Sequence, residues 1–125
     1  MIRLTAPFAV LGATALAALL LSTTAGAVTH PKLIGVVGKN DAYKISLKSG
    51  TKAVKTIKAG TYTFVIHDDS SIHNFELDGP HGKSWTFTSI EFKGTKTVTI
   101  ALKAGKYKAY CAAHESTMFQ HFTVS

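Results

Sequence analysis

Glycine-centred turn signals divide most of this chain into short segments, and this spacing constrains the fold more than any other feature. Between the turns, residues alternate between apolar and polar or form β-branched and aromatic runs, which is typical of strands. No window beyond residue 28 supports a long helix. The strands are expected near residues 33–37, 42–48, 53–57, 61–67, 72–77, 85–92, 95–102, 106–111 and 119–124. This pattern predicts an all-β protein, either an antiparallel β-sandwich or a small Greek-key barrel.

The first 27 residues differ in composition from the rest of the chain. Arg3 precedes an uncharged run from Leu4 to Leu21, and Ala25 and Ala27 then supply a small-residue cleavage pattern. This arrangement predicts a secretory signal peptide over residues 1–27 and a mature domain over residues 28–125 that is secreted or periplasmic. The alternative is an uncleaved N-terminal anchor, since the apolar run is close to the shortest that spans a bilayer. After cleavage, no stable membrane insertion is expected.

Charge and cysteine content limit the function classes of the mature domain. Beyond residue 27 the chain has 13 lysines, 7 acidic residues and no arginine, which gives a net charge of +6. Arginine is the residue best suited to reading bases and phosphates, so no nucleic-acid partner is expected. The excess of lysine favours a partner with an acidic docking surface, although many of the lysines fit the solvated faces of strands. A single cysteine cannot form an internal disulfide.

A short motif occurs twice and relates the two halves of the domain. Residues 58–62 read Lys-Ala-Gly-Thr-Tyr and residues 103–107 read Lys-Ala-Gly-Lys-Tyr. Each copy precedes a strand that runs toward a histidine, His73 in the first half and His114 in the second. Two equivalent hairpins would bring their far ends to the same end of a sandwich. The repeat therefore gives a reason for residues 38 positions apart, such as His73 and Cys111, to meet.

The segment from Tyr110 to Met118 carries the most chemistry. It places a thiol at Cys111, an imidazole at His114 and a thioether at Met118 on one short loop, and His73 is the best source of a second imidazole. Two histidines and a cysteine in a plane, with a distant methionine, favour copper for electron transfer. Zinc is the alternative metal, because a Cys-His-His site can hold it with water as the fourth ligand. A lone cysteine is more often a buried apolar residue, but an unpaired thiol in an exported protein favours a ligand role.

The sequence resembles the cupredoxins, the blue copper proteins that include plastocyanin, pseudoazurin and amicyanin. The resemblance covers roughly residues 33–125 and is carried by Gly60-Thr61-Tyr62-Thr63-Phe64, Ile72-His73-Asn74-Phe75, Gly105-Lys106-Tyr107 and the segment Tyr110–Met118. It implies a Greek-key antiparallel β-sandwich that binds one copper ion. His73, Cys111 and His114 would then be the equatorial ligands and Met118 the weak axial one.

The same resemblance implies that Asn74 is not a ligand itself but hydrogen-bonds across to the loop that carries Cys111, His114 and Met118. This hydrogen bond is called the brace below. The partner of Asn74 in the family is often a serine or threonine just after the cysteine, but this chain has Ala112 there. The brace must therefore run to the backbone or be absent. The spacing from His114 to Met118 is also one residue shorter than in plastocyanin, which affects the axial distance and the reduction potential.

The function implied by the resemblance is that of an exported one-electron carrier with redox protein partners, not an enzyme, and a monomer is expected. Copper storage or delivery with the same ligands is the alternative, and a hydrolase using Cys111 as the nucleophile would leave Met118 unexplained.

The remaining histidines are interpreted as solvated or structural residues: His30, His67, His81 and His121. For His67, the adjacent Asp68 and Asp69 indicate a surface pair.

Overall fold

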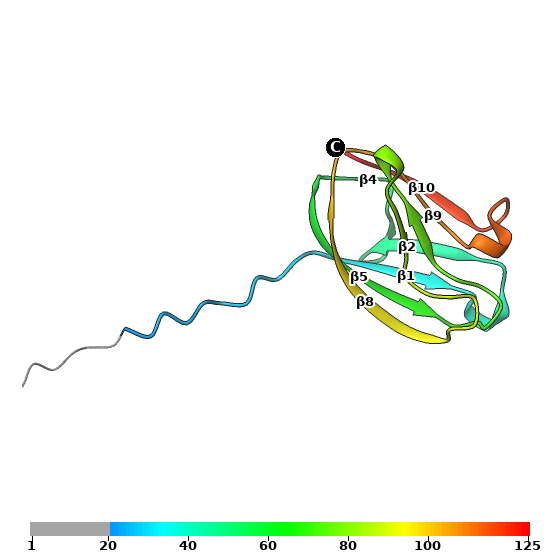
Figure 1. The fold of residues 1–125 in the computed structure, drawn as a ribbon, viewed down its shortest axis with the longest axis horizontal. Helices are drawn as coiled ribbons and strands as arrows, with labels where there is room; N and C mark the ends of the chain where they lie inside the picture. Colours follow the sequence, from blue (N-terminus) through cyan, green and yellow to red (C-terminus); the bar gives the residue numbers. More distant parts are fainter. Residues whose placement is uncertain (1–20) are drawn as a thin grey trace, which may run out of the picture.

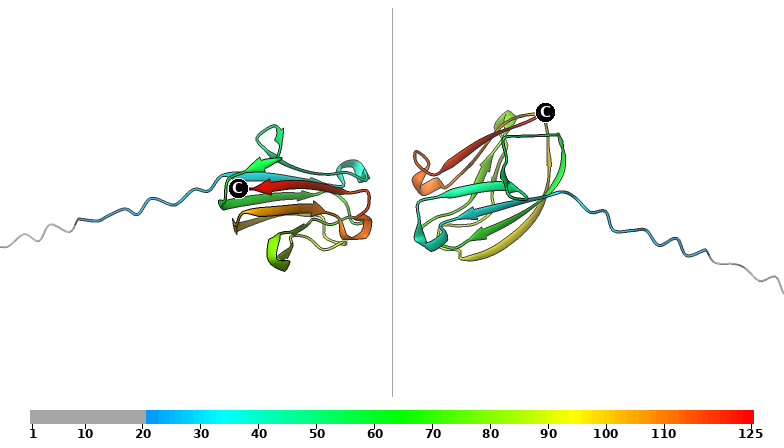
Figure 2. Two further views of the ribbon diagram at one scale, coloured as in Figure 1. Left: turned by 90° about the horizontal axis from the view of Figure 1, so that it is seen from above. Right: turned by 180° about the vertical axis from the view of Figure 1, so that it is seen from behind.

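A computed structural model describes residues 21–125, so most of the predicted signal peptide lies outside the described residues. Residues 21–31 have no regular secondary structure and run away from the domain (Figure 1). The domain consists of two five-stranded sheets that face each other as a sandwich (Figures 1 and 2). No helix among the described residues is long and apolar enough to cross a membrane.

The first sheet has the strand order β3-β2-β1-β5-β8 and the second has the order β4-β10-β9-β6-β7. The strands of the first sheet are β1 (Lys32–Val37), β2 (Ile45–Ser49), β3 (Lys52–Ala53), β5 (Gly60–Asp68) and β8 (Gly94–Leu102). Those of the second are β4 (Thr56–Ile57), β6 (Glu76–Asp78), β7 (Ser84–Thr86), β9 (Gly105–Tyr110) and β10 (Phe119–Val124). The all-β sandwich prediction is confirmed, but the sheets are mixed rather than wholly antiparallel. The pairs β1–β5 and β4–β10 are parallel.

Apolar side chains from both sheets form one core between them. The largest fully buried members are Phe64, Phe75, Leu33, Leu47, Ile66 and Leu77. Five of them occupy inward-facing strand positions, as the period-two pattern predicts, and Phe75 directly precedes β6. The ring of Phe87 lies 5.2 Å from that of Phe64 and 5.8 Å from that of Phe75, both measured between centroids. This core provides a rigid support for the loops at the ends of the sandwich.

Two predicted strands are much shorter than expected. Residues 72–75 and 87–92 alternate in hydrophobicity, yet the structure places them in loops that flank β6 and β7. The backbone amide of Phe75 donates to the side-chain oxygen of Thr88 at 2.9 Å, and the amide of Phe87 donates to the carbonyl of Phe75 at 2.9 Å. The Thr88 hydroxyl thus accepts the hydrogen bond that the carbonyl of a neighbouring strand would accept in a sheet. A side chain that competes with the sheet for a backbone amide ends a strand that hydrophobic period alone would extend.

The repeated Lys-Ala-Gly-x-Tyr motif forms the same structure twice. The Tyr62 hydroxyl donates to the carbonyl of Lys58 at 2.6 Å, and the Tyr107 hydroxyl donates to the carbonyl of Lys103 at 2.9 Å. Each tyrosine therefore ties its strand to the turn that precedes it, like the tyrosine corner of other β-sandwiches. The two strands that begin there, β5 and β9, lead to the loops that carry His73 and His114. The prediction that both loops meet at one end of the sandwich is confirmed.

The Gln120 side chain links the two sheets. Its Oε1 accepts from the amide of Leu47 at 2.9 Å, and its Nε2 donates to the carbonyls of Leu47 and Val54 at 2.9 and 3.0 Å. Gln120→Ala should lower the free energy of unfolding by about 2 kcal/mol, because it leaves partly buried backbone groups without partners. Urea unfolding of the metal-free protein measures this. The exposed neighbour His121 provides the control, and an equal loss in His121→Ala and Gln120→Ala would contradict the assignment.

Candidate metal centre

The predicted ligand residues lie together at one end of the sandwich. His73 lies in the loop between β5 and β6, rather than inside a strand as expected, and Cys111 follows β9 directly. His114 ends a 3-10 turn over Ala112–His114, and Met118 immediately precedes β10. In Figure 1 this loop is the orange segment at the end of the domain away from the C-terminus.

Three donor atoms converge at this end. The Nδ1 atoms of His73 and His114 are 3.1 Å apart, and the Cys111 sulfur lies 3.9 Å from the first and 3.8 Å from the second. A point in the plane of this triangle lies about 2.0 Å from both nitrogens and about 2.3 Å from the sulfur, which are the bond lengths of imidazole and thiolate to a metal such as zinc. His73, Cys111 and His114 could therefore hold a metal ion in a trigonal arrangement.

The metal centre is enclosed on most sides. His73 and Cys111 are both 0% exposed and Met118 is 1% exposed, whereas His114 is half-buried and its neighbours Ala112 and Ala113 are exposed. Burial lowers the pKa of His73, and the neighbouring His114 lowers it further. The His73 imidazole is therefore kept neutral, which is the form that binds metals.

The brace expected from Asn74 runs to the backbone. The Asn74 Oδ1 accepts from the backbone amide of Ala112 at 2.8 Å, and the backbone amide of Asn74 donates to the Cys111 sulfur at 3.4 Å. Its Nδ2 donates to Glu76 at 3.1 Å, which fixes the orientation of the carboxamide. Ala112 therefore does not prevent the brace, because its backbone amide supplies the donor.

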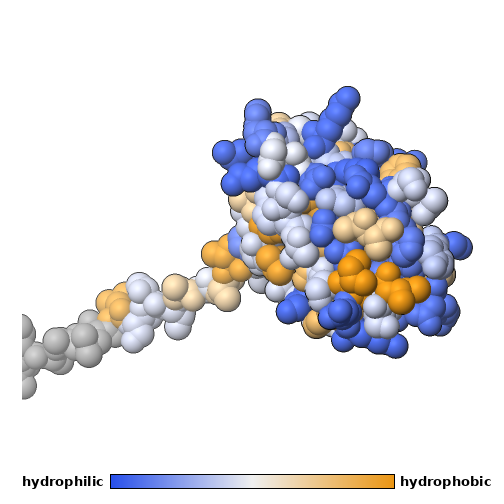
Figure 3. Space-filling model, turned by 45° about the vertical axis from the view of Figure 1, so that its right-hand side comes forward, coloured by the Kyte–Doolittle hydropathy of each residue, from blue (hydrophilic) through white to orange (hydrophobic). Residues whose placement is uncertain are grey.

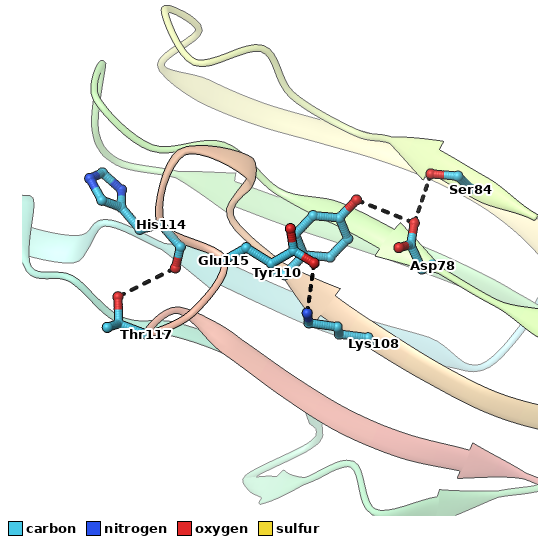
Figure 4. A network of polar contacts seen from close by, with 7 residues as sticks. All are labelled: Asp78, Ser84, Lys108, Tyr110, His114, Glu115 and Thr117. Carbon is cyan, nitrogen blue, oxygen red and sulfur yellow. Dashed lines mark hydrogen bonds and ion pairs between the residues drawn. The ribbon is translucent and has the colours of Figure 1, made fainter.

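Backbone hydrogen bonds close the ligand loop on itself. The amide of Cys111 donates to the carbonyl of Met118 at 3.1 Å, and the amides of Thr117 and Met118 donate to the carbonyl of His114 at 3.1 and 2.8 Å. The Thr117 hydroxyl also donates to that carbonyl at 3.3 Å, as Figure 4 shows. Met118 is thereby fixed beside Cys111 and His114, the two candidate ligands of its own loop. Its role as an axial ligand stays a prediction.

A second set of polar contacts holds the start of the loop to β6 and β9. The Tyr110 hydroxyl donates to Asp78 at 3.3 Å, and the same carboxylate oxygen accepts from Ser84 at 2.8 Å (Figure 4). Lys108 forms an ion pair with Glu115 at 2.8 Å, which joins β9 to the middle of the loop. Burial raises the pKa of Tyr110, with Glu76 and Asp78 adding to the effect, so the hydroxyl remains a donor.

Two residues near the site were missed from the sequence. Tyr43, expected in a strand, lies in the loop before β2, and its ring contacts the imidazoles of both His73 and His114. Gly38 has φ of +67°, and a Cβ there would lie 2.4 Å from the Ser70 Cβ and 3.0 Å from the Cδ2 of His73. Only glycine allows the chain to pass this close to Ser70 and His73. A turn signal marked Gly38, but nothing in the sequence marked Tyr43.

The expected surface pair of His67 with its neighbouring carboxylates is wrong for Asp68. The Asp68 side chain is fully buried, and its Oδ1 accepts from the amide of Ser70 at 3.2 Å. Its Oδ2 has no hydrogen-bond partner within residues 21–125. His67 instead contacts the Thr95 hydroxyl, with 3.1 Å between Nδ1 and Oγ1. The last residue of β5 points inward because the alternation along that strand continues to its end.

Asp68 should make the stability of the metal-free protein depend on pH. Burial raises its pKa above the ordinary value of 3.8, so the folded state keeps this proton to a higher pH than the unfolded state does. The contribution of protonated Asp68 to the free energy of unfolding is fully present below a pH of 3.8 and is lost as the pH rises through the folded-state pKa. Asp68→Asn should therefore lose less stability than the wild type between acid and neutral pH. Urea unfolding at several pH values checks this, with exposed Asp69→Asn as the control; parallel curves for wild type and Asp68→Asn would contradict it.

No protein-family model matches the sequence, and neither does any curated protein sequence. Solved structures do match the fold. Reduced rusticyanin aligns with a TM-score of 0.53 and 15% identity, over 75% of this chain and 78% of its own. Auracyanin A, a "blue" copper protein from the green thermophilic photosynthetic bacterium Chloroflexus aurantiacus, aligns with a TM-score of 0.51 and 21% identity, over 75% of this chain and 98% of its own.

The two matched proteins are cupredoxins. This chain therefore has the cupredoxin fold, and the resemblance seen in the sequence is confirmed at that level.

Proposed function

We propose that this protein is an exported one-electron carrier that holds a single copper ion with His73, Cys111 and His114, with Met118 as the weak axial ligand. The observation that carries the proposal is the triangle of one thiol sulfur and two imidazole nitrogens, which lie 3.1 to 3.9 Å apart. This donor set at this spacing suits copper in both of its common oxidation states. A bound copper ion would supply reversible one-electron chemistry.

The protein's own residues would keep the ligands in place during the electron transfer. His73 and Cys111 belong to loops anchored by the sandwich core, and Asn74 bridges the two loops through the Ala112 amide. Because ligands held in this way move little when the charge of the metal changes, the barrier to electron transfer is small. The enclosure of the site also opposes metal release, which favours electron transfer over copper storage or delivery.

His114 is the ligand through which electrons would enter or leave. It is half-buried, whereas His73 is fully buried, and it lies beside the exposed Ala112 and Ala113. Of the large apolar side chains that are exposed in the domain, Ile72 and Phe119 directly adjoin residues of this site in the sequence. Figure 3 turns this end of the domain toward the viewer and shows a small apolar group among hydrophilic side chains. An apolar contact patch beside a ligand fits brief docking of a redox protein.

Redox cycling of the copper-loaded protein tests this proposal against copper handling. An electron carrier should accept and return one electron per protein over many cycles without losing copper. A storage or delivery protein should instead pass its copper readily to a metal-free acceptor protein under the same conditions. Loss of copper on the first reduction would contradict the proposal.

The lysine-rich surface predicts that the redox partner is acidic at its docking site. Lys39 and Lys44 are exposed on either side of Tyr43, and among the described residues the one ion pair is that of Lys108 with Glu115. The second-order rate of electron transfer with such a partner should fall as the ionic strength rises. Lys39→Gln with Lys44→Gln should weaken this dependence more than Lys58→Gln with Lys103→Gln, which remove equal charge near the tyrosine corners. A rate that does not change with salt would contradict the prediction.

A further inference from the structure

Tyr43 lies directly against both metal-binding histidines. Its ring centroid is 4.8 Å from that of His73 and 4.7 Å from that of His114, with interplanar angles of 78° and 74°. The two imidazoles are themselves 4.8 Å apart at 70°, so the three rings form a mutual edge-to-face cluster. We propose that Tyr43 is a positioning residue that holds the two imidazoles together and closes the solvent side of the metal centre against external ligands.

The burial of the cluster supports a closing role. The Tyr43 side chain is 57% exposed, whereas His73 beneath it is 0% exposed. Tyr43 is therefore the most exposed group of this cluster, and it covers the fully buried His73. Because no hydrogen bond of its hydroxyl to another residue is present among the described residues, the aromatic ring, rather than the hydroxyl, makes the contact with the imidazoles.

Tyr43 also lines a cleft from which the ring would keep small anions away from the metal centre. The cleft has a volume of about 550 Å³ and lies beside Met118. Its lining includes Lys39, Tyr43, Lys44, Thr117, Met118 and Phe119, but none of the three donor residues. The lysine charges would attract small anions into this space. Tyr43 borders the cleft and also contacts the imidazoles, so its ring is the wall between them.

The edge-to-face contacts also place the donor atoms of the two histidines close together. His73 comes from the β5–β6 loop, which crosses from one sheet to the other, and His114 comes from the loop between β9 and β10; their Nδ1 atoms are nevertheless 3.1 Å apart. Edge-to-face packing is a favoured geometry for aromatic pairs, and Tyr43 makes it with both rings at once. Residues that orient metal ligands typically change metal affinity by about 10- to 100-fold when they are replaced.

Anion binding to the copper-loaded protein tests the closing role, which rests on the metal centre of the proposed function. Azide is titrated into wild type, Tyr43→Ala, Tyr43→Phe and Phe119→Ala, and the visible spectrum is recorded. Phe119→Ala is the matched control, because Phe119 is 45% exposed and lines the same cleft. Tyr43→Ala should bind azide at least about tenfold more tightly than the other three, since only it opens the wall. Equal azide binding in all four proteins would overturn the proposal.

A second measurement needs no metal and therefore separates this proposal from the proposed function. Metal-free protein is treated with diethyl pyrocarbonate, and mass spectrometry measures the modification rate of each histidine. His73 should react at least about tenfold faster in Tyr43→Ala than in wild type and Tyr43→Phe, while the exposed His81 and His121 react equally in all. If Tyr43→Ala does not give the thermal unfolding transition of a folded domain, Tyr43→Val replaces it. An unchanged rate at His73 in the folded variant would overturn the proposal, whether or not the protein carries electrons.

Discussion

Replacing Cys111 with serine should abolish the intense visible absorption of the copper-loaded protein while leaving the β-sandwich folded. The absorption of a copper–thiolate site arises from charge transfer from sulfur to Cu(II), and a serine hydroxyl cannot supply it. Serine has nearly the shape of cysteine and can still accept the hydrogen bond that the Asn74 amide donates to the sulfur. The fold should therefore lose no more than about 1 to 3 kcal/mol of stability.

The matched control for Cys111→Ser is Ala112→Ser. It adds a hydroxyl at the next position of the same loop without touching a donor atom, and it should keep the colour. Absorption spectra and thermal unfolding of the three proteins measure both effects. A coloured Cys111→Ser protein would refute Cys111 as the ligand, and an unfolded one would show that the cysteine serves mainly in the core.

Replacing Met118 with glutamine should lower the reduction potential while copper stays bound. If the Met118 sulfur is the weak axial ligand, the three equatorial donors hold the metal without it. A harder amide oxygen in its place favours Cu(II) over Cu(I), which lowers the potential. Met118→Leu, which keeps the volume but removes the donor, should raise the potential instead.

Opposite shifts of the reduction potential in Met118→Gln and Met118→Leu would not follow from a change in packing alone. Met118 is 1% exposed, so a purely structural role predicts that glutamine costs stability by burying an amide while the potential stays unchanged. Voltammetry and thermal unfolding of both variants separate these outcomes. An unchanged potential with a large fall in melting temperature would refute the ligand role.

The parts of the fold that the sequence predicts well are those that depend on local patterns. The strands β5, β8, β9 and β10 lie within about one residue of the expected ranges, because each has either regular alternation or a β-branched run between glycine turns. The parallel pairing of β1 with β5 was not predicted, because such pairing joins segments that are distant in the sequence and leaves no local signal. Residues 87–92 were wrongly predicted as strand because the Thr88 side chain makes a tertiary hydrogen bond.

The same distinction holds at the metal centre. Cys111, His114 and His73 were found because thiol and imidazole groups are rare and their spacing is informative, and the structure brings all three together. Tyr43 was not found, because an aromatic residue in an alternating segment is typical of a strand. Its contact with two histidines arises only when the loop before β2 packs against both the β5–β6 loop and the β9–β10 loop. Asp68 was placed on the surface for a similar reason, since its burial depends on the packing of β5.

The central claim is that His73, Cys111 and His114 form a one-electron copper centre, and a titration of the metal-free protein with Cu(II) tests it most directly. The visible absorption and the electron paramagnetic resonance spectrum are recorded at each addition. The account predicts an intense absorption that rises until one equivalent of copper is bound, disappears on reduction and returns on reoxidation. A colourless protein after one equivalent, or a colour that does not return after one cycle of reduction and reoxidation, would contradict it.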